Sequence, residues 1–529
     1  MRSDIFKRLL YVATYVYLVL PYLVFFGGWV RQPYSTLFIL LLSGALFFGL
    51  KISKGMFLSE PRTHVSYRTV ALVVLPVIVV ALVAGAGGWG FQDTDWLKHN
   101  AILRDLITEP WPVIYEAEGK RVMLTYYTAY QLPAALVGKL LGWEAANHAL
   151  FLYTVIGLCL STLWVWLITE VKWWFAVVFL AFSGMDMIGQ LVLTVSQEPT
   201  IVGGLRSLSY KVRALEHLEW WAGWGFAQFS SNAALIVWVP NQAIAGWLLT
   251  SLVLNDAKVR WLHRTALLYL GLCTLWTPFV TLGLIPFVFV LVFCEWRERH
   301  FSHDMWQGLV SWPNGTGLLI GIFVAIYLAG RFEAYALPID LGVNIYKERI
   351  TWTFLRLPDH FVAKYIRFIV LEFAVLNVLL YLYLVLQKGP QFTALRNLLL
   401  LSSGILFALP FLNWGWNNEP AMRTSIPALF VTALIAIRLL SDPPRSSQAV
   451  WIRRAIAGVL IVGSTNAAVE LGRHVAGVYR HQALVSVPEI TEVRTLFQLQ
   501  HERYRKYYNF VGQYVGSAES FFARHLAKR

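Results

Sequence analysis

The chain has 529 residues, of which 57% are hydrophobic and only 14% are charged. A soluble protein of this length carries about 25% charged residues, so the composition excludes an ordinary water-soluble enzyme. The formal net charge of +14 does not require a nucleic acid partner, because membrane proteins collect excess Lys and Arg in their cytoplasmic loops. We therefore expect a membrane protein whose partner is the lipid bilayer, with no nucleic acid.

Apolar stretches long enough to cross a bilayer recur along the whole chain. The pattern predicts an all-α fold, a polytopic transmembrane helix bundle of about 13 spans of about 20 residues or slightly fewer. Proline at 278 breaks the helix between two short spans, so a shallow hairpin is one interpretation of that pair. The expected spans are 9–29, 34–50, 69–89, 148–169, 173–194, 233–254, 265–277, 279–294, 315–330, 366–386, 397–413, 422–440 and 454–469.

The short connections that are rich in Lys and Arg all fall on one side of the membrane if the N-terminus lies inside. Examples are the connections that contain Lys51, Arg260 and Arg445. The positive-inside rule therefore predicts a cytoplasmic N-terminus and a C-terminus on the outer face. We expect a multi-pass protein of the bacterial inner membrane whose active site faces the periplasm.

This orientation divides the chain into three parts. Two N-terminal helices with a cytoplasmic loop come first, the core with its outer connections follows, and a helical tail on the outer face ends the chain. The three parts are 1–68, 69–470 and 471–529, and the outer connections of the core are 90–147, 196–232, 331–365 and 413–422.

The first outer connection begins with two acidic residues directly after an apolar run. A helix that begins near Asp95 places Asp95 and His99 on one face, because residues four apart are neighbours on a helix. That face is the apolar one, and partial removal from water shifts pKa values toward those that acid–base chemistry needs. Asp93, Asp95 and His99 are therefore the candidate catalytic residues. The alternative is that either aspartate only caps the helix. We expect this helix and the aromatic segment 126–141 to lie along the membrane interface.

The second outer connection contains charged residues and then an aromatic-rich stretch, 220–229. Glu198 and Arg206 are candidates for binding polar groups of a substrate. Aromatic rings beside polar groups suit sugar recognition, which makes Trp224 a candidate, although a belt of Trp side chains at the headgroups is the alternative. Gln242 lies within an apolar span, where a polar side chain faces the bundle interior or joins two helices.

Arg423 lies at the outer mouth of an apolar span, and Glu419 precedes it in the connection 413–422. A guanidinium in this position can bind a phosphate through two hydrogen bonds. The alternative is an ordinary flanking Arg that pairs with Glu419. The sequence contains no Walker loop, no G-x-G-x-x-G after a strand, no HExxH and no nucleophile elbow, so we expect neither ATP coupling nor a Rossmann-like domain that binds a nucleotide sugar.

In this organisation the chain resembles the GT-C superfamily of polytopic glycosyltransferases, which take sugar from a polyprenyl-phosphate carrier on the outer side of the membrane. The resemblance rests on span 69–89, on the long connection that opens with Asp93-Thr94-Asp95, on segment 126–141 and on the short paired helices around Pro278. It covers roughly residues 69–440. Two extra spans before the acidic connection depart from the simplest layout of that family.

The resemblance implies inverting transfer of a sugar from a polyprenyl-phosphate-linked donor to a lipid-linked or glycan acceptor. Asp93 or Asp95 would act as general base on the acceptor hydroxyl, or would help to hold a divalent metal, Mg²⁺ or Mn²⁺, at the donor phosphate. Arg423, and as a second choice Arg206, would neutralise the departing polyprenyl phosphate.

Two other functions fit the same organisation. An enzyme like the O-antigen polymerases and ligases would also use lipid-linked substrates on the outer face, and would depend on Arg and His in the outer loops. A transporter or flippase of lipid-linked sugars would instead need ionisable residues near the middle of the spans, and often shows repeated halves. The sequence shows no such halves, and its most conspicuous acids lie at the membrane edge.

Overall fold

The computed structural model describes residues 2–57, 64–117, 119–222, 226–300, 302–334, 361–387, 389–412, 418–504 and 511–528. Within these ranges the chain is mostly helical, and nine helical segments are long and apolar enough to cross a membrane. The protein is therefore a multi-pass helical membrane protein. The segments are α1 (Ser3–Trp29), α2 (Tyr34–Phe57), α6 (Trp143–Thr169), α13 (Pro278–Glu298), α15 (Trp312–Ala334), α17 with α18 (Phe361–Ile369 and Val375–Leu386, joined by a π-helical turn at Val370–Ala374), α19 (Pro390–Ala408), α20 with α21 (Glu419–Thr424 and Ile426–Ser441) and α22 (Ser447–His481).

The other four expected spans correspond to shorter or interrupted helices, so the total of about 13 spans stays a prediction. These helices are α3 (Tyr67–Ala81), α7 and α8 (Phe175–Leu180 and Asp186–Gln197), α10 and α11 (Asn232–Trp238 and Pro240–Lys258) and α12 (Ala266–Thr274). The remaining short helices are α4 (Thr94–Thr108), α5 (Leu132–Leu141), α9 (Ile201–Arg213), α14 (His303–Leu309), α23 (Leu496–Leu499), α24 (Phe521–His525) and the 3-10 turns η1 (Ala86–Gly88) and η2 (Glu219–Ala222).

The expected span 173–194 is divided into two helices, because the chain leaves the helical conformation between Leu180 and Asp186. The backbone of this break bonds to neighbouring segments instead of to its own helix. The amide of Met185 donates to the carbonyl of Leu371 at 3.0 Å, and the amide of Asn232 donates to the carbonyl of Phe182 at 3.0 Å. Tertiary partners thus supply the hydrogen bonds that a broken helix needs inside a membrane.

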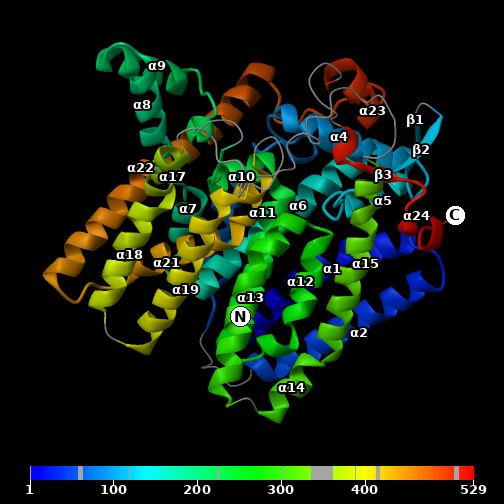
Figure 1. The fold of residues 1–529 in the computed structure, drawn as a ribbon, viewed down its shortest axis with the longest axis horizontal. Helices are drawn as coiled ribbons and strands as arrows, with labels where there is room; N and C mark the ends of the chain where they lie inside the picture. Colours follow the sequence, from blue (N-terminus) through cyan, green and yellow to red (C-terminus); the bar gives the residue numbers. More distant parts are fainter. Residues whose placement is uncertain are drawn as a thin grey trace.

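Helix α11 lies at the centre of the bundle. It contacts α6, α12, α13 and α21, and every residue from Pro240 to Val253 is buried. In Figure 1, α18, α19, α21 and α22 lie on one side of it, and α1, α2, α12 and α15 lie on the other. A helix that neighbouring helices surround does not need the hydropathy of a lipid-facing span, which explains the polar residues within α11.

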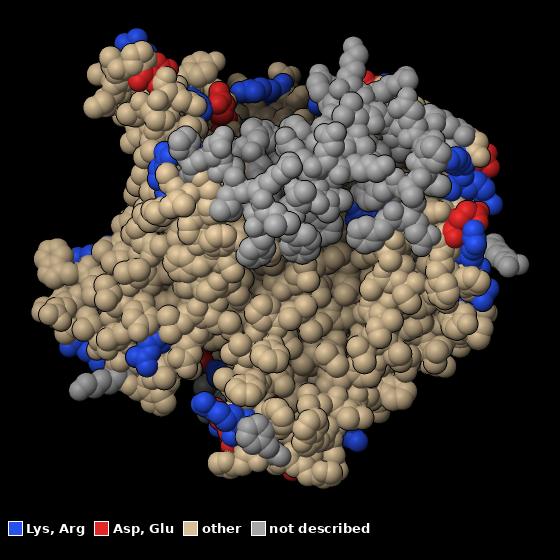
Figure 2. Space-filling model, viewed as in Figure 1, with Lys and Arg blue, Asp and Glu red and all other residues tan. Residues whose placement is uncertain are grey.

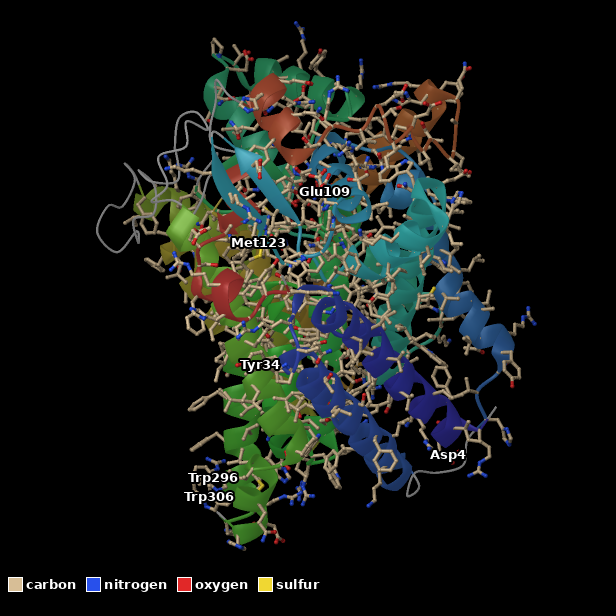
Figure 3. The ribbon with its side chains drawn as sticks, turned by 90° about the vertical axis from the view of Figure 1, so that its right-hand side faces the viewer. Asp4, Tyr34, Glu109, Met123, Trp296 and Trp306 are labelled. Carbon is tan, nitrogen blue, oxygen red and sulfur yellow. The ribbon has the colours of Figure 1, made fainter. Side chains whose placement is uncertain are left out.

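The bundle has two polar ends separated by a broad uncharged belt (Figure 2). Asp4, Trp296 and Trp306 lie at one end and Glu109 lies at the other (Figure 3). The N-terminus and the connection after α13 therefore share an end, opposite α4, as the charge pattern requires. Which end faces the periplasm stays a prediction.

A small antiparallel sheet departs from the all-α expectation. Strands β1 (Ile114–Ala117) and β2 (Lys120–Leu124) form a hairpin, and β3 (Val515–Ser517) pairs with β2. The sheet thus joins the first long connection to the C-terminal tail, and α22 itself continues beyond residue 470 to His481. A strand of three residues whose partner lies almost 400 positions away leaves no local pattern in the sequence.

Candidate functional site

A run of glycines turns the chain out of α3 and into α4. Gly87 has a φ of +60°, and a Cβ atom there would collide with the backbone carbonyl of Asn147 on α6. Only glycine accepts both this backbone conformation and this close approach. Further along, the indole of Trp96 donates to the carbonyl of Val237 at 3.1 Å, which attaches α4 to α10. These contacts fix the position of the acidic residues at the end of the bundle.

Asp93 is the N-cap residue of α4. Its carboxylate accepts a hydrogen bond from the amide of Thr94, and its other oxygen, Oδ2, lies 3.0 Å from Nη2 of Arg473 on α22. These contacts match the capping alternative for Asp93. They also hold the start of α4 against α22.

Asp95 lies in the first turn of α4 and is half-buried. Its Oδ2 atom lies 2.7 Å from Nζ of Lys98, three residues further along the helix. Burial raises the pKa of the Asp95 carboxyl, but the positive charge and hydrogen bond of Lys98, with the positive charge of Arg423, outweigh burial and leave this pKa below its usual value. Asp95 is therefore an ionised carboxylate at neutral pH.

The imidazole of His99 is buried beside the ring of Trp96, at 5.2 Å between centroids. Its Nδ1 atom lies 3.2 Å from the amide nitrogen of Gln131, at the start of α5. Burial, reinforced by the positive charge of Lys98, lowers the pKa of His99 to about 3. His99 is therefore a neutral imidazole, which can exchange hydrogen bonds with a substrate but carries no charge.

Arg423, in the short helix α20, is joined to α11 through the hydroxyl of Tyr127. Nη1 of Arg423 donates to this hydroxyl at 2.7 Å, and Nε2 of Gln242 donates to it at 3.3 Å. The guanidinium also lies over the ring of Phe279, with 5.9 Å to the centroid. Its positive charge acts on both Asp95 and His99. The structure thus brings four of the predicted site residues together: Asp95, His99, Gln242 and Arg423.

The other predicted site residues are not part of this group. Glu198 and Arg206 are exposed on the hairpin of α8 and α9, which projects from the bundle at a distance from α4 (Figure 1). Glu419 is the first residue of α20, and its side chain lies outside the described part of the structure. Trp224 lies outside the described residues.

The two aspartates do not fit a shared metal site. Asp93 pairs with Arg473 and Asp95 pairs with Lys98, so a side-chain cation accompanies each carboxylate. Among the residues that the structure describes, no three His, Cys, Asp or Glu side chains are grouped so that they could hold a metal ion. No step through a metal is therefore derived for this site.

Three residues of the site were not singled out by the sequence: Lys98, Tyr127 and Gln131. Lys98 follows Asp95 by three residues, so the two lie on the same side of α4 and the long Lys side chain reaches back to the carboxylate. Tyr127 is one of several interfacial aromatic residues, and its contact with Arg423 depends on a segment 296 residues away. The spacing of residues along a helix is enough to identify Lys98, but no local signal in the sequence identifies Tyr127 or Gln131.

Asp105 attaches the other end of α4 to the sheet and to the tail. Its Oδ2 atom accepts hydrogen bonds from the hydroxyl of Tyr115, at 2.9 Å, and from the amide of Leu496, at 3.3 Å. Burial raises the pKa of this carboxyl from 3.8 to about 6, against the opposing effect of these hydrogen bonds and of Arg104. Protonation of Asp105 therefore stabilises the folded protein.

The stability of the protein should accordingly decrease as Asp105 ionises. Its pKa is higher in the folded state than in the unfolded state, so its contribution is full below about pH 4 and is lost as the pH rises through about 6. The loss is on the order of 2 kcal/mol. Asp105→Asn, which keeps an acceptor for Tyr115, should flatten this part of the pH profile of thermal unfolding. Asp304→Asn, which changes an exposed acid on α14, is the control, and equal profiles for the two variants would contradict the assignment.

The fold and the site together define a multi-pass helical membrane protein with a partly buried polar site at one end of the bundle. Comparisons of the chain with models of known families, with curated proteins and with solved structures each gave no match. The function proposed below therefore rests on the site itself.

Proposed function

We propose that this protein is a membrane glycosyltransferase of the GT-C type. It transfers a sugar, with inversion, from a polyprenyl-phosphate-linked donor to an acceptor on the outer face of the bacterial inner membrane. The observation that supports this proposal is the position of Asp95, an ionised carboxylate, within the electrostatic influence of Arg423 at one end of an apolar bundle. The proposed reaction needs a negative charge beside the acceptor hydroxyl and a positive charge beside the donor phosphate, and Asp95 and Arg423 supply these charges.

The proposed reaction is a single displacement at the anomeric carbon. The acceptor oxygen forms the new bond as the bond from carbon to the phosphate oxygen breaks, and Asp95 accepts the proton of the acceptor hydroxyl. The leaving phosphate gains negative charge in the transition state, and Arg423 stabilises that charge. Tyr127 orients the guanidinium through the 2.7 Å hydrogen bond.

Two neutral groups are available for the hydroxyls of the sugar. Oε1 of Gln242 accepts no hydrogen bond from any residue that the structure describes, although the atom is buried. A buried acceptor without a donor costs about 1–3 kcal/mol, which a sugar hydroxyl would recover. His99, held neutral beside Gln131, can donate or accept a further bond. Asp93 positions α4 and does not take part in the displacement.

A transfer assay tests the proposal. The purified full-length protein, in a bilayer nanodisc, is given polyprenyl-phosphate sugars that carry a labelled sugar and a set of glycan and lipid-linked acceptors. Labelled product from the wild type, and its loss in Asp95→Asn, would support the enzyme. Asp304→Asn is the matched control, because this acid is exposed and lies at the other end of the bundle.

A second candidate function is transport of a lipid-linked sugar, and one observation favours it. Two buried carboxyl groups, Asp186 and Glu372, meet within the bundle, and Glu372 lies in the membrane-spanning segment Phe361–Leu386. Ionisable groups at that depth are typical of coupled transporters. Movement of an intact labelled lipid-linked sugar across proteoliposomes, without transfer, would establish this function in place of the enzyme.

A further inference from the structure

Asp186 and Glu372 bring two carboxyl groups into contact in the interior of the bundle. Asp186 is the first residue of α8, and Glu372 lies in the π-helical turn Val370–Ala374 near the middle of a 26-residue apolar segment. Both side chains are buried. Gly184 makes room for the pair, because a Cβ atom there would collide with Oε2 of Glu372. A π-helical turn within an α-helix is frequent at functional sites.

Each carboxyl group uses one oxygen to accept a hydrogen bond from a fixed donor. The hydroxyl of Ser183 donates to Oδ2 of Asp186 at 2.8 Å, and the indole of Trp221 donates to Oε1 of Glu372 at 2.9 Å. The other two oxygens, Oδ1 of Asp186 and Oε2 of Glu372, accept no hydrogen bond from any donor group in the described part of the chain. The two carboxyl groups lie within hydrogen-bonding reach of each other.

Two carboxylates in contact cannot both carry a charge away from water. A proton between them turns the repulsion into a hydrogen bond. A metal or sodium ion fits this pair less well, because hard cations take a shell of several oxygen ligands and the pair offers only two uncommitted oxygens. The other two oxygens, Oδ2 of Asp186 and Oε1 of Glu372, already accept hydrogen bonds from Ser183 and Trp221.

The surrounding charges favour a proton over a second negative charge. Glu219 is a third acidic residue near both carboxyl groups. Its own carboxylate accepts hydrogen bonds from the amide and hydroxyl of Ser231, at 2.9 and 2.7 Å, and from Gln228 at 2.7 Å. Among the charged and titratable groups on the elements packed against α8, those in the polar contacts around the pair are Lys211 on α9, Glu219 in η2 with His217 just before it, and Glu470, Arg473 and His474 on α22.

A continuous series of polar contacts connects the pair to the end of the bundle where α4 begins. From that end, Asp93 contacts Arg473 at 3.0 Å, Arg473 contacts Glu470 at 2.6 Å, and Glu470 contacts Nδ1 of His217 at 3.0 Å. His217 lies 3.8 Å from Glu219. Burial opposes the charged form of His217, but Glu470 and Glu219 outweigh burial and raise its pKa.

The last contacts of the series lead from Glu219 to the acid pair. The amide of Asn466 donates to Oε1 of Glu219 at 2.9 Å and to the hydroxyl of Ser183 at 3.2 Å, and Ser183 in turn donates to Asp186. Every side chain between Arg473 and the pair is buried. The pair is therefore isolated from water but is electrostatically coupled to the α4 end of the bundle.

We propose that Asp186 and Glu372 form a binding site for one exchangeable proton inside the membrane-spanning bundle, and that the series of polar contacts couples this site electrostatically to the end of the bundle where α4 lies. The carboxyl group that holds the proton donates its O–H to the carboxylate of the other. This site does not depend on sugar transfer, so it stands or falls separately from the proposed enzyme.

Infrared difference spectroscopy of the full-length protein in nanodiscs tests this proposal. A protonated carboxyl group gives a carbonyl-stretch band that a carboxylate lacks, and the band shifts when D2O replaces water. The spectrum of the wild type minus that of Glu372→Gln, or of Asp186→Asn, should contain this band near neutral pH and show the shift in D2O. Other buried carboxyl groups, such as Asp256, are present in both samples and cancel in the difference.

The absence of the band from the difference spectrum of a folded variant would overturn the proposal, and so would a band that does not shift in D2O. Loss of the band when Na⁺ replaces choline at constant pH would identify a sodium site instead. Trp221→Phe provides an independent test, because it keeps an aromatic ring at this position and removes the N–H donor to Glu372. The band should persist in this variant at a changed frequency, and an unchanged frequency would contradict the assignment. Glu198→Gln, which changes an exposed acid directly after the far end of α8, should leave the band of the protonated carboxyl group unchanged.

Discussion

Replacement of Asp95 by asparagine is expected to slow sugar transfer by at least about 100-fold, the contribution of a positioned general base. Asparagine keeps the size of the side chain and its hydrogen bond to Lys98, but it cannot accept the proton of the acceptor hydroxyl. The measurement is the initial rate of transfer under saturating donor and acceptor, with the amount of folded protein determined by size-exclusion chromatography.

Asp93→Asn is the matched control for this experiment, because it changes the same functional group two residues earlier. Asparagine caps a helix as well as aspartate does. The lost pair with Arg473 is partly exposed and contributes about 1 kcal/mol or less. Transfer by Asp93→Asn should therefore stay within a few-fold of the wild type. A full rate in Asp95→Asn, or a larger loss in Asp93→Asn, would contradict the roles assigned to the two aspartates.

Replacement of Arg473 by methionine is expected to lower the free energy of unfolding by about 3 kcal/mol, as when one partner of a buried ion pair is removed. Arg473 contacts Asp93 at 3.0 Å and Glu470 at 2.6 Å, and its guanidinium lies over the ring of Trp238 at 4.9 Å. Methionine retains part of the packing and leaves Glu470, which is buried, without the guanidinium that contacts it at 2.6 Å. Thermal unfolding in detergent, followed by circular dichroism, measures the effect.

Arg480→Met is the control for that variant, because Arg480 is an exposed residue near the end of the same helix. Its change in stability should be within about 0.5 kcal/mol. The double variant Arg473→Met with Glu470→Gln removes both charges and should recover part of the lost stability. Equal stability of the two single variants, or no recovery in the double variant, would show that Arg473 does not compensate a buried charge.

Two pairs of predicted site residues show how far local patterns reach in this chain. Asp95 and His99 were identified from their spacing on one helix, and the structure keeps both at the same end of α4. Glu198 and Arg206 were chosen from composition alone, and they lie on a hairpin that projects away from that end. Helical spacing predicts neighbours within one element, whereas composition does not say which loops meet.

The sequence contains a local signal for Asp186 and Glu372, but it contains none for the contact between them. Asp186 and Glu372 are single carboxyl groups within apolar runs, and such residues are candidates for function by position alone. The contact between them depends on the break before α8 and on the π-helical turn, neither of which has a local pattern. Their pairing across 186 positions is therefore a property of the folded bundle.

The sequence by itself determined that the protein is helical, crosses the membrane several times and carries acidic residues at the start of a long connection. Hydropathy and helical periodicity are local quantities, and they survive in any arrangement of the helices. Tertiary structure alone decided which polar side chains meet: Asp93 with Arg473, Arg423 with Tyr127, and Asp186 with Glu372. Each of these contacts removes polar groups from water, and that cost is compensated only when helices distant in sequence bury matching side chains against each other.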